Sequence, residues 1–418
     1  MIFPALLIIT LAAFAILSWR NQKLGIILLF ALLPTYLVRF SIGPIPSTLL
    51  EGLVLITIVK AVISSISLPL TKGELEGVWR SFGWYRVPIV LVVIAGIVST
   101  IIAPDTFSAL GILKAYIIEP VLLAFVIKAA MTDRDDIEKI VTALITSATV
   151  VGTLAIFQIL THIGIPDAWT IENRATSLYD YPNAVGLFIA PVVTVAIVRY
   201  ASSMKKLDRS LLQPIPIISI LLMLGGIVSA KTEAALVAIP AALVIIGLLA
   251  PIAGRIKYGI IAATITGACA VSLFAPSIMQ KIVLHDSSGL VRRAQWSETL
   301  TMLADRPFLG AGLNGYPTAL VPYHDATFYE IFQYPHNIFL NVWSEMGLVG
   351  LIGLMTCAFL VARTTWRRRD DALVLAFSAA ILTMAIHGLV DVPLFKNDLA
   401  IFAAFCVMGM LVKKETKI

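Results

Sequence analysis

The sequence has little charge and few cysteines. Charged residues make up 13% of its 418 residues and hydrophobic residues 59%, and the mean hydropathy is +0.94. Such a composition excludes a soluble globular protein. The apolar segments are continuous, which excludes a transmembrane barrel, because barrel strands alternate with period two. The fold class predicted from composition is therefore an all-α polytopic membrane protein.

Two further classes are excluded by what is scarce. The three cysteines lie far apart inside apolar segments, so we expect neither a disulfide framework nor a metal site. The net charge of +6 comes from short basic clusters between apolar segments, which set membrane topology, so no nucleic-acid partner is predicted. The Asp-x-Asp pair Asp133 and Asp135 lies among mixed charges and is interpreted as a solvated loop.

Apolar runs of roughly 17–25 residues predict twelve or thirteen transmembrane helices. We expect spans near 2–18, 24–39, 47–66, 87–103, 108–129, 138–161, 183–199, 212–229, 234–252, 257–275, 337–362, 372–390 and 397–412. The first run lacks a basic leader, so it is predicted to be a span and not a cleaved signal. Basic residues concentrate on alternate connections, 22 of the 31 on one side, which the positive-inside rule makes cytoplasmic.

These spans divide the chain into three parts. Residues 1–275 are predicted to be the amino-terminal transmembrane helices, 276–335 a long loop on the outer side, and 336–418 the carboxy-terminal helices. A loop of that length usually carries function or its own structure. Helical spacing of apolar residues within it predicts an amphipathic helix over 290–304 that lies on the membrane surface.

One stretch concentrates polar chemistry at a predicted helix start. Pro335 and Asn337 can begin and cap the helix, which places His336 at the outer membrane surface, where an imidazole could transfer protons. Asp391 follows His387 by four residues at the outer end of the next span, so both would share one helix face. There Asp391 could orient a histidine or a substrate hydroxyl.

The outer side holds few basic residues, so each is informative. Arg174 leads into a helix start near Asn183, and Arg292 precedes Trp296 by one turn of the loop helix. Because the guanidinium fork and a helix amino terminus both favour phosphate oxygens, the two arginines could form a diphosphate cradle. From spacing alone, each arginine taken by itself is better explained as an anchor at the lipid headgroups.

Two lysines are weaker candidates for the same anion. Lys231 lies in a tight outer turn, where it could either pair with Glu233 or contact substrate. Lys114 lies near the outer rim of the fifth predicted span and could add to an anion site. Its spacing of five from Glu119 argues against simple pairing on one helix.

The motifs resemble those of the bacterial O-antigen ligase and polymerase superfamily. The resemblance rests on residues 335–340 (Pro-His-Asn-Ile-Phe-Leu), 345–351 (Glu-Met-Gly-Leu-Val-Gly-Leu), 292–296 (Arg-Arg-Ala-Gln-Trp), 305–312 (Asp-Arg-Pro-Phe-Leu-Gly-Ala-Gly), 174–176 (Arg-Ala-Thr) with 182–184 (Pro-Asn-Ala), and 229–231 (Ser-Ala-Lys). They cover the second half of the chain well and the first half only by hydropathy.

This resemblance implies a GT-C-like membrane glycosyltransferase that acts without nucleotide sugar, metal or cofactor. It would move a glycan from an undecaprenyl-pyrophosphate carrier to an acceptor hydroxyl of a glycan or lipid A-core, on the outer face of the bacterial inner membrane. The resemblance implies that Arg174 and Arg292 hold the pyrophosphate and that His336 activates or positions the acceptor. A transporter or flippase of lipid-linked glycan is the rival function, and a membrane scaffold is the third.

Overall fold

The computed structural model describes residues 2–43, 45–67, 72–205, 214–274, 280–281, 283–325 and 327–412. Its helices are α1 (Ile2–Arg20), α2 (Gln22–Ala31), α3 (Leu49–Ser67), α4 (Lys72–Ser81), α5 (Arg86–Ile101), α6 (Thr106–Ile112), α7 (Glu119–Ala130), α8 (Arg134–Thr161), α9 (Asp167–Thr170), α10 (Pro182–Lys205), α11 (Pro214–Ala230), α12 (Glu233–Leu249), α13 (Gly254–Phe274), α15 (Ser287–Asp305), α16 (Tyr316–Leu320), α17 (Ile338–Arg367), α18 (Ala372–His387) and α19 (Asn397–Met410). Shorter 3-10 segments are η1 (Leu33–Leu37), η2 (Gly83–Tyr85) and η5 (Val321–Tyr323), and η3 (Leu113–Ile118) is π-helical.

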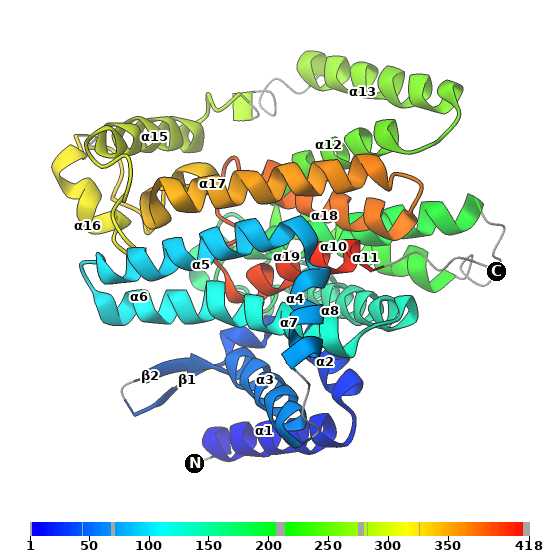
Figure 1. The fold of residues 1–418 in the computed structure, drawn as a ribbon. Helices are drawn as coiled ribbons and strands as arrows, with labels where there is room; N and C mark the ends of the chain where they lie inside the picture. Colours follow the sequence, from blue (N-terminus) through cyan, green and yellow to red (C-terminus); the bar gives the residue numbers. More distant parts are fainter. Residues whose placement is uncertain are drawn as a thin grey trace.

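The all-α membrane class is confirmed. Within the described residues, five helical stretches are long and apolar enough to cross a bilayer: Gly83–Ile101, Thr106–Ala130, Arg134–Thr161, Pro182–Ser203 and Ile338–Arg367. Each of the thirteen predicted spans overlaps a helix of the structure. In Figure 1, α15, α16 and the β1–β2 hairpin gather at one end of the bundle, and the α17–α18 connection lies at the opposite end.

The prediction of one span over 24–39 was wrong. Helix α2 ends at Ala31, and a hairpin of β1 (Arg39–Ile42) and β2 (Ile45–Thr48) follows, with Arg39 paired to Thr48. Pro34 removes a backbone donor from the continuing helix, and Gly43 takes φ +60 at the turn. The apolar run therefore changes from helix to strand before it reaches the length of a span.

The long loop carries the predicted helix, but the helix is not amphipathic as predicted. Its start, three residues early, is set by Asp286, whose carboxylate accepts from the Gly289 N–H at 2.9 Å. The buried face of α15 includes Gln295, Glu298 and Thr299. These polar groups have hydrogen-bond partners in the same loop. The hydroxyls of Thr299 and Tyr316, for example, form a hydrogen bond of 2.9 Å. Side-chain hydrogen bonds as well as apolar contact therefore hold α15.

Helix α17 breaks at Gly347, where φ is +64 and ψ −172. The segment after α15 fills the break: the Leu348 N–H donates to the Phe308 carbonyl at 2.9 Å, and the Ala311 N–H donates to Ser344 at 2.6 Å. A Cβ at Gly347 would lie 2.3 Å from the Phe308 oxygen, so only glycine fits. The apolar helix and the loop that contains α15 are thereby joined through backbone hydrogen bonds.

Glu345, one turn before Leu348, completes this junction. It is only 3% exposed, and its carboxylate accepts the backbone N–H groups of Asn314 and, at 3.3 Å, Tyr316. A buried carboxylate requires such donors. The motif that begins at Glu345 and runs through Gly347 therefore has a structural role, because it fixes the loop after α15 against α17.

Candidate functional site

His336 lies in the short connection that enters α17. Its backbone takes φ +48, which is unusual for a residue with a Cβ. The imidazole is half-buried, with the rings of Phe332 and Tyr334 edge-on at 5.2 and 5.1 Å between centroids. Such backbone strain persists only where the surroundings determine the conformation.

Helix α15 provides two of the contacts that determine it. The Trp296 indole N–H donates to the Pro335 carbonyl at 2.8 Å, and the Gln295 amide donates to the Tyr334 carbonyl at 3.0 Å. Both carbonyls directly precede His336. The predicted supporting residue Trp296 therefore holds the backbone of the histidine connection.

Asn337 fixes the connection from the other side. Its carbonyl oxygen caps α17 by accepting the N–H groups of Phe339 at 3.0 Å and Leu340 at 3.1 Å, as predicted. Its amide donates to the Leu389 carbonyl at 3.1 Å, and the Ile338 N–H donates to Gly388 at 2.7 Å. The histidine connection is thus docked onto the segment that follows α18.

The surroundings of His336 favour a neutral imidazole. Burial lowers the pKa of His336 below its ordinary value of 6.5; the Asp391 carboxylate raises it, and the charges of Arg292 and Lys396 lower it. The net effect is a lowered pKa, so the side chain is neutral at pH 7. A neutral imidazole can accept a proton from a hydroxyl group.

Arg292 brings a positive charge to this site, and its charge lowers the pKa of His336. Its Nε is buried and has no hydrogen-bond partner within the described parts of the chain, while the neighbouring Arg293 is exposed. An unpartnered buried guanidinium nitrogen is costly unless an acceptor binds it. Arg292, and not Arg293, therefore faces the surroundings of His336.

Arg174, Asn183 and Lys231 form a second group. The Arg174 guanidinium donates to the Ala230 carbonyl at 3.1 Å and to the Asn183 side chain at 2.9 Å. It also lies over the Trp169 ring at 5.3 Å from its centroid. These contacts connect the loop before α10 to the α11–α12 turn, so most of the Arg174 donors already bind protein.

The predicted pairing of Lys231 with Glu233 was wrong. The Lys231 ammonium donates to the Glu172 carbonyl at 2.6 Å, and Glu233 forms its ion pair with Lys281. Lys231 has a left-handed backbone, with φ +51, at the end of α11. The turn therefore directs the Lys231 side chain toward the 172–183 loop and away from Glu233.

Lys114 also differs from its prediction as a free anion-binding group. Its ammonium pairs with Glu51 of α3 at 3.0 Å, which neutralises its charge. The partner is 63 positions away in sequence, so helical spacing around Lys114 could not reveal it. Lys114 therefore has no unpaired charge for a pyrophosphate.

His387 and Asp391 do not share a helix face. Helix α18 ends at His387, and Asp391 lies in the segment beyond it, where its carboxylate accepts the Val392 N–H at 2.8 Å. Gly388 follows the last helical residue, which ends the helical spacing. Both side chains are buried, 2% and 5% exposed, and Asp391 is an electrostatic neighbour of His336.

The sequence argument missed Lys396 and Tyr181. The Lys396 ammonium lies 4.9 Å from the centroid of the Tyr181 ring and donates to its hydroxyl. Tyr181 interacts in turn with the hydroxyl of Tyr334, two residues before His336. The available signal was that Lys396 is one of the few basic residues predicted on the outer side, directly before a helix start.

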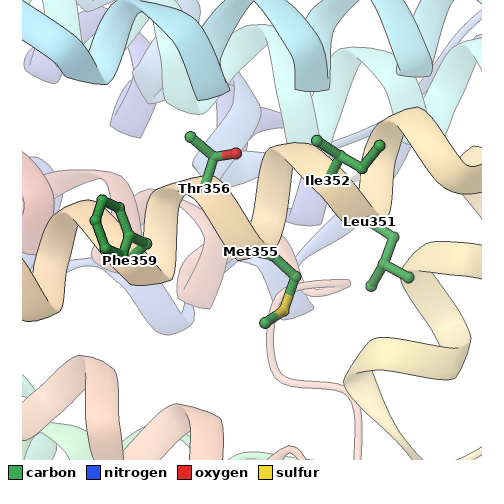
Figure 2. A pocket seen from close by; sticks show the side chains of 5 residues that line it. All are labelled: Leu351, Ile352, Met355, Thr356 and Phe359. Atoms are coloured by element: carbon green, nitrogen blue, oxygen red, sulfur yellow. The ribbon is translucent and has the colours of Figure 1, made fainter.

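Other features do not add to this site. No group of three His, Cys, Asp or Glu side chains with metal-ligand geometry occurs in the residues that the structure covers. A shallow cavity of about 370 Å³ lies along α17, and Figure 2 shows its lining side chains on successive turns: Leu351, Ile352, Met355, Thr356 and Phe359. Its lining side chains are mostly apolar and none of them is titratable, so it is not a place for acid–base chemistry.

Comparison with known proteins identifies the segment around His336. Residues 218–355 match the model of a family described as O-antigen ligase, a range that includes α15, Arg292, His336 and the break in α17. A curated O-antigen ligase of Pseudomonas aeruginosa is 27% identical over 184 residues, which cover 44% of this chain and 43% of that relative. The chain thus matches less than half of the relative's length. Together these matches confirm the resemblance of this chain to the O-antigen ligase family.

Proposed function

We propose that the protein transfers a glycan from an undecaprenyl-pyrophosphate carrier to an acceptor hydroxyl, at the His336 site on the outer face of the bacterial inner membrane. The observation that carries the proposal is a neutral imidazole beside an arginine whose Nε has no protein partner. The first can accept a proton, and the second can bind an anion. The family match supports glycan transfer as the reaction.

In this reaction the acceptor oxygen attacks the anomeric carbon of the donor glycan. A new glycosidic bond forms, and the bond from the anomeric carbon to the pyrophosphate oxygen breaks. His336 takes the proton from the acceptor hydroxyl, and Arg292 stabilises the negative charge that develops on the leaving pyrophosphate. Arg174 remains a proposed second contact, through the guanidinium N–H that its protein contacts leave free. Both a polysaccharide end and a lipid A-core supply hydroxyls that fit this chemistry.

Two substitutions test the proposal: one removes the proton acceptor at His336 and the other the charge of Arg292, each with little change in side-chain size. Membrane vesicles that carry His336→Gln or Arg292→Gln should transfer glycan at least about 100-fold more slowly than the parent chain. Arg293→Gln is the matched control because Arg293 is exposed beside Arg292, and it should transfer at the parental rate. Parental rates for His336→Gln would refute the proposal.

One observation favours a transporter as second candidate. Glu119 is 3% exposed within the candidate span Thr106–Ala130, and its Oε2 has no hydrogen-bond partner in the described structure. Polar groups at that depth are typical of substrate pathways. The two functions differ in their products, because a transferase releases free undecaprenyl pyrophosphate and a transporter moves the intact lipid. Quantifying the released carrier lipid in vesicles therefore distinguishes them.

A further inference from the structure

Lys396 is a half-buried cation that no carboxylate neutralises. It directly precedes α19, and its ammonium contacts the ring and the hydroxyl of Tyr181. Three other lysines predicted on the same side have an oxygen partner that is charged or belongs to the backbone: Lys114 has Glu51, Lys281 has Glu233, and Lys231 has the Glu172 carbonyl. In the described part of the chain, Lys396 has no such ion pair.

Tyr181 holds Lys396 without cancelling its charge. Burial raises the pKa of the Tyr181 phenol, so the phenol stays protonated and uncharged at neutral pH. Two carboxylates lie nearby: Asp391 accepts the Val392 N–H at 2.8 Å, and Asp398 accepts the Leu399 N–H at 2.9 Å. Neither forms an ion pair with Lys396 among the described residues, so the ammonium can still contact an anion.

Arg292 and Lys396 reach the histidine from different elements. Arg292 belongs to α15 of the outer loop, and Lys396 stands at the start of α19 in the helical bundle. The charges of both lower the pKa of His336, so both lie close to its imidazole. Around the neutral imidazole, Arg292 and Lys396 are the two cations and Asp391 is the facing carboxylate.

We propose that Lys396 is the second cation of the anion site, and that with Arg292 it binds the pyrophosphate of the lipid-linked donor while Tyr181 positions its ammonium. This inference rests on the proposed function, because it names the residue that binds the leaving group of that reaction. A diphosphate has several charged oxygens, so one arginine fork and one ammonium can bind it together. Lys396 thus has the pyrophosphate-binding role that was predicted for Lys114 and Lys231, whose ammonium groups contact Glu51 and the Glu172 carbonyl.

Binding of a short-chain isoprenyl pyrophosphate tests the assignment directly. The purified full-length chain in detergent is titrated with farnesyl pyrophosphate, and with farnesol as the uncharged probe. Lys396→Gln should weaken farnesyl pyrophosphate binding by at least about tenfold, the loss of one charge-assisted contact, and leave farnesol binding unchanged. Lys396→Arg, which keeps the charge, should retain most of the affinity. Lys281→Gln is the matched control, since it removes a lysine already paired with Glu233.

The outcomes separate this inference from the proposed function. A parent chain that does not bind farnesyl pyrophosphate contradicts the proposed function itself. A parent chain that binds, together with Lys396→Gln of equal affinity, contradicts only the assignment of Lys396. If Lys396→Gln does not fold, as judged by its thermal unfolding, Tyr181→Phe replaces it, because loss of the hydroxyl should release the ammonium and weaken binding several-fold; unchanged affinity there would also overturn the assignment.

A pH profile of transfer excludes a merely structural effect. Removal of the Lys396 charge raises the pKa of His336, because that charge lowers it in the parent chain. The acid limb of the rate profile should therefore move to higher pH in Lys396→Gln and stay in place in Lys396→Arg. A loss of rate by the same factor at every pH, with no shift of the limb, would count against the assignment.

Discussion

Trp296→Phe tests whether α15 sets the conformation of the histidine connection. The change keeps an aromatic ring and removes the N–H that donates to Pro335 at 2.8 Å. A left-handed backbone such as that of His336 costs about 1–2 kcal/mol, and each hydrogen bond contributes about 0.5–1.5 kcal/mol. The bonds from Gln295 and Trp296 together contribute about 1–3 kcal/mol, which offsets the strain, and loss of one bond removes about half of this contribution. Since about 1.4 kcal/mol corresponds to a factor of ten, glycan transfer should slow by up to about tenfold.

The matched control is Trp343→Phe. The Trp343 indole N–H also donates to a proline carbonyl, that of Pro307 at 2.7 Å, but this bond joins α17 to the loop away from His336. Both variants should lose a similar free energy of unfolding, about 1 kcal/mol, measured as thermal unfolding in detergent. Initial transfer rates in vesicles, normalised to folded protein, should then fall only for Trp296→Phe. Equal rate losses in the two variants would refute the reasoning.

Three further predictions concern the same region. Because the pKa of His336 lies below 6.5, its imidazole is still mainly neutral at pH 6.5, and the transfer rate should fall only at more acidic pH. A midpoint of the acid limb above pH 6.5 would contradict the lowered pKa. Glu345→Gln replaces the carboxyl group that accepts two backbone N–H groups with an amide that has only one acceptor oxygen, so the free energy of unfolding should drop by about 1–3 kcal/mol, and an unchanged thermal midpoint would argue against the junction. Gly347→Ala places a Cβ 2.3 Å from the Phe308 oxygen at φ +64 and should destabilise strongly, whereas Gly111→Ala, with nothing within 4 Å, should not; similar melting curves for the two would exclude the proposed role of the break.

Local signals in the sequence predicted the elements that depend on neighbouring residues. The cap at Asn337 and the approximate extent of α15 follow from residues within a few positions of each element. Helical spacing placed Trp296 one turn after Arg292 on the same helix, although it did not predict that the indole would bind the backbone before His336. These features needed only helical spacing and capping chemistry.

Long-range contacts explain what the sequence could not predict. The pairing of Lys114 could not be predicted because its partner Glu51 is on another helix, and no role was predicted for Lys396 because Tyr181 lies 215 positions away. The hairpin after α2 was hidden in a run whose hydropathy suits a span. In each case tertiary packing, and not local preference, decides the outcome.

The break at Gly347 also measures how far the chemistry lies from the hydrocarbon. The part of α17 after the break, 348–367, has about 20 residues and a length of about 30 Å, which matches the hydrocarbon thickness of a bilayer. The nine or so residues before the break add about 13 Å. If the second part spans the membrane, His336 stands up to about 13 Å above the acyl chains, in the polar region outside the hydrocarbon. A carrier lipid would then keep its polyprenyl tail in the bilayer while its charged headgroup meets the histidine in the polar layer.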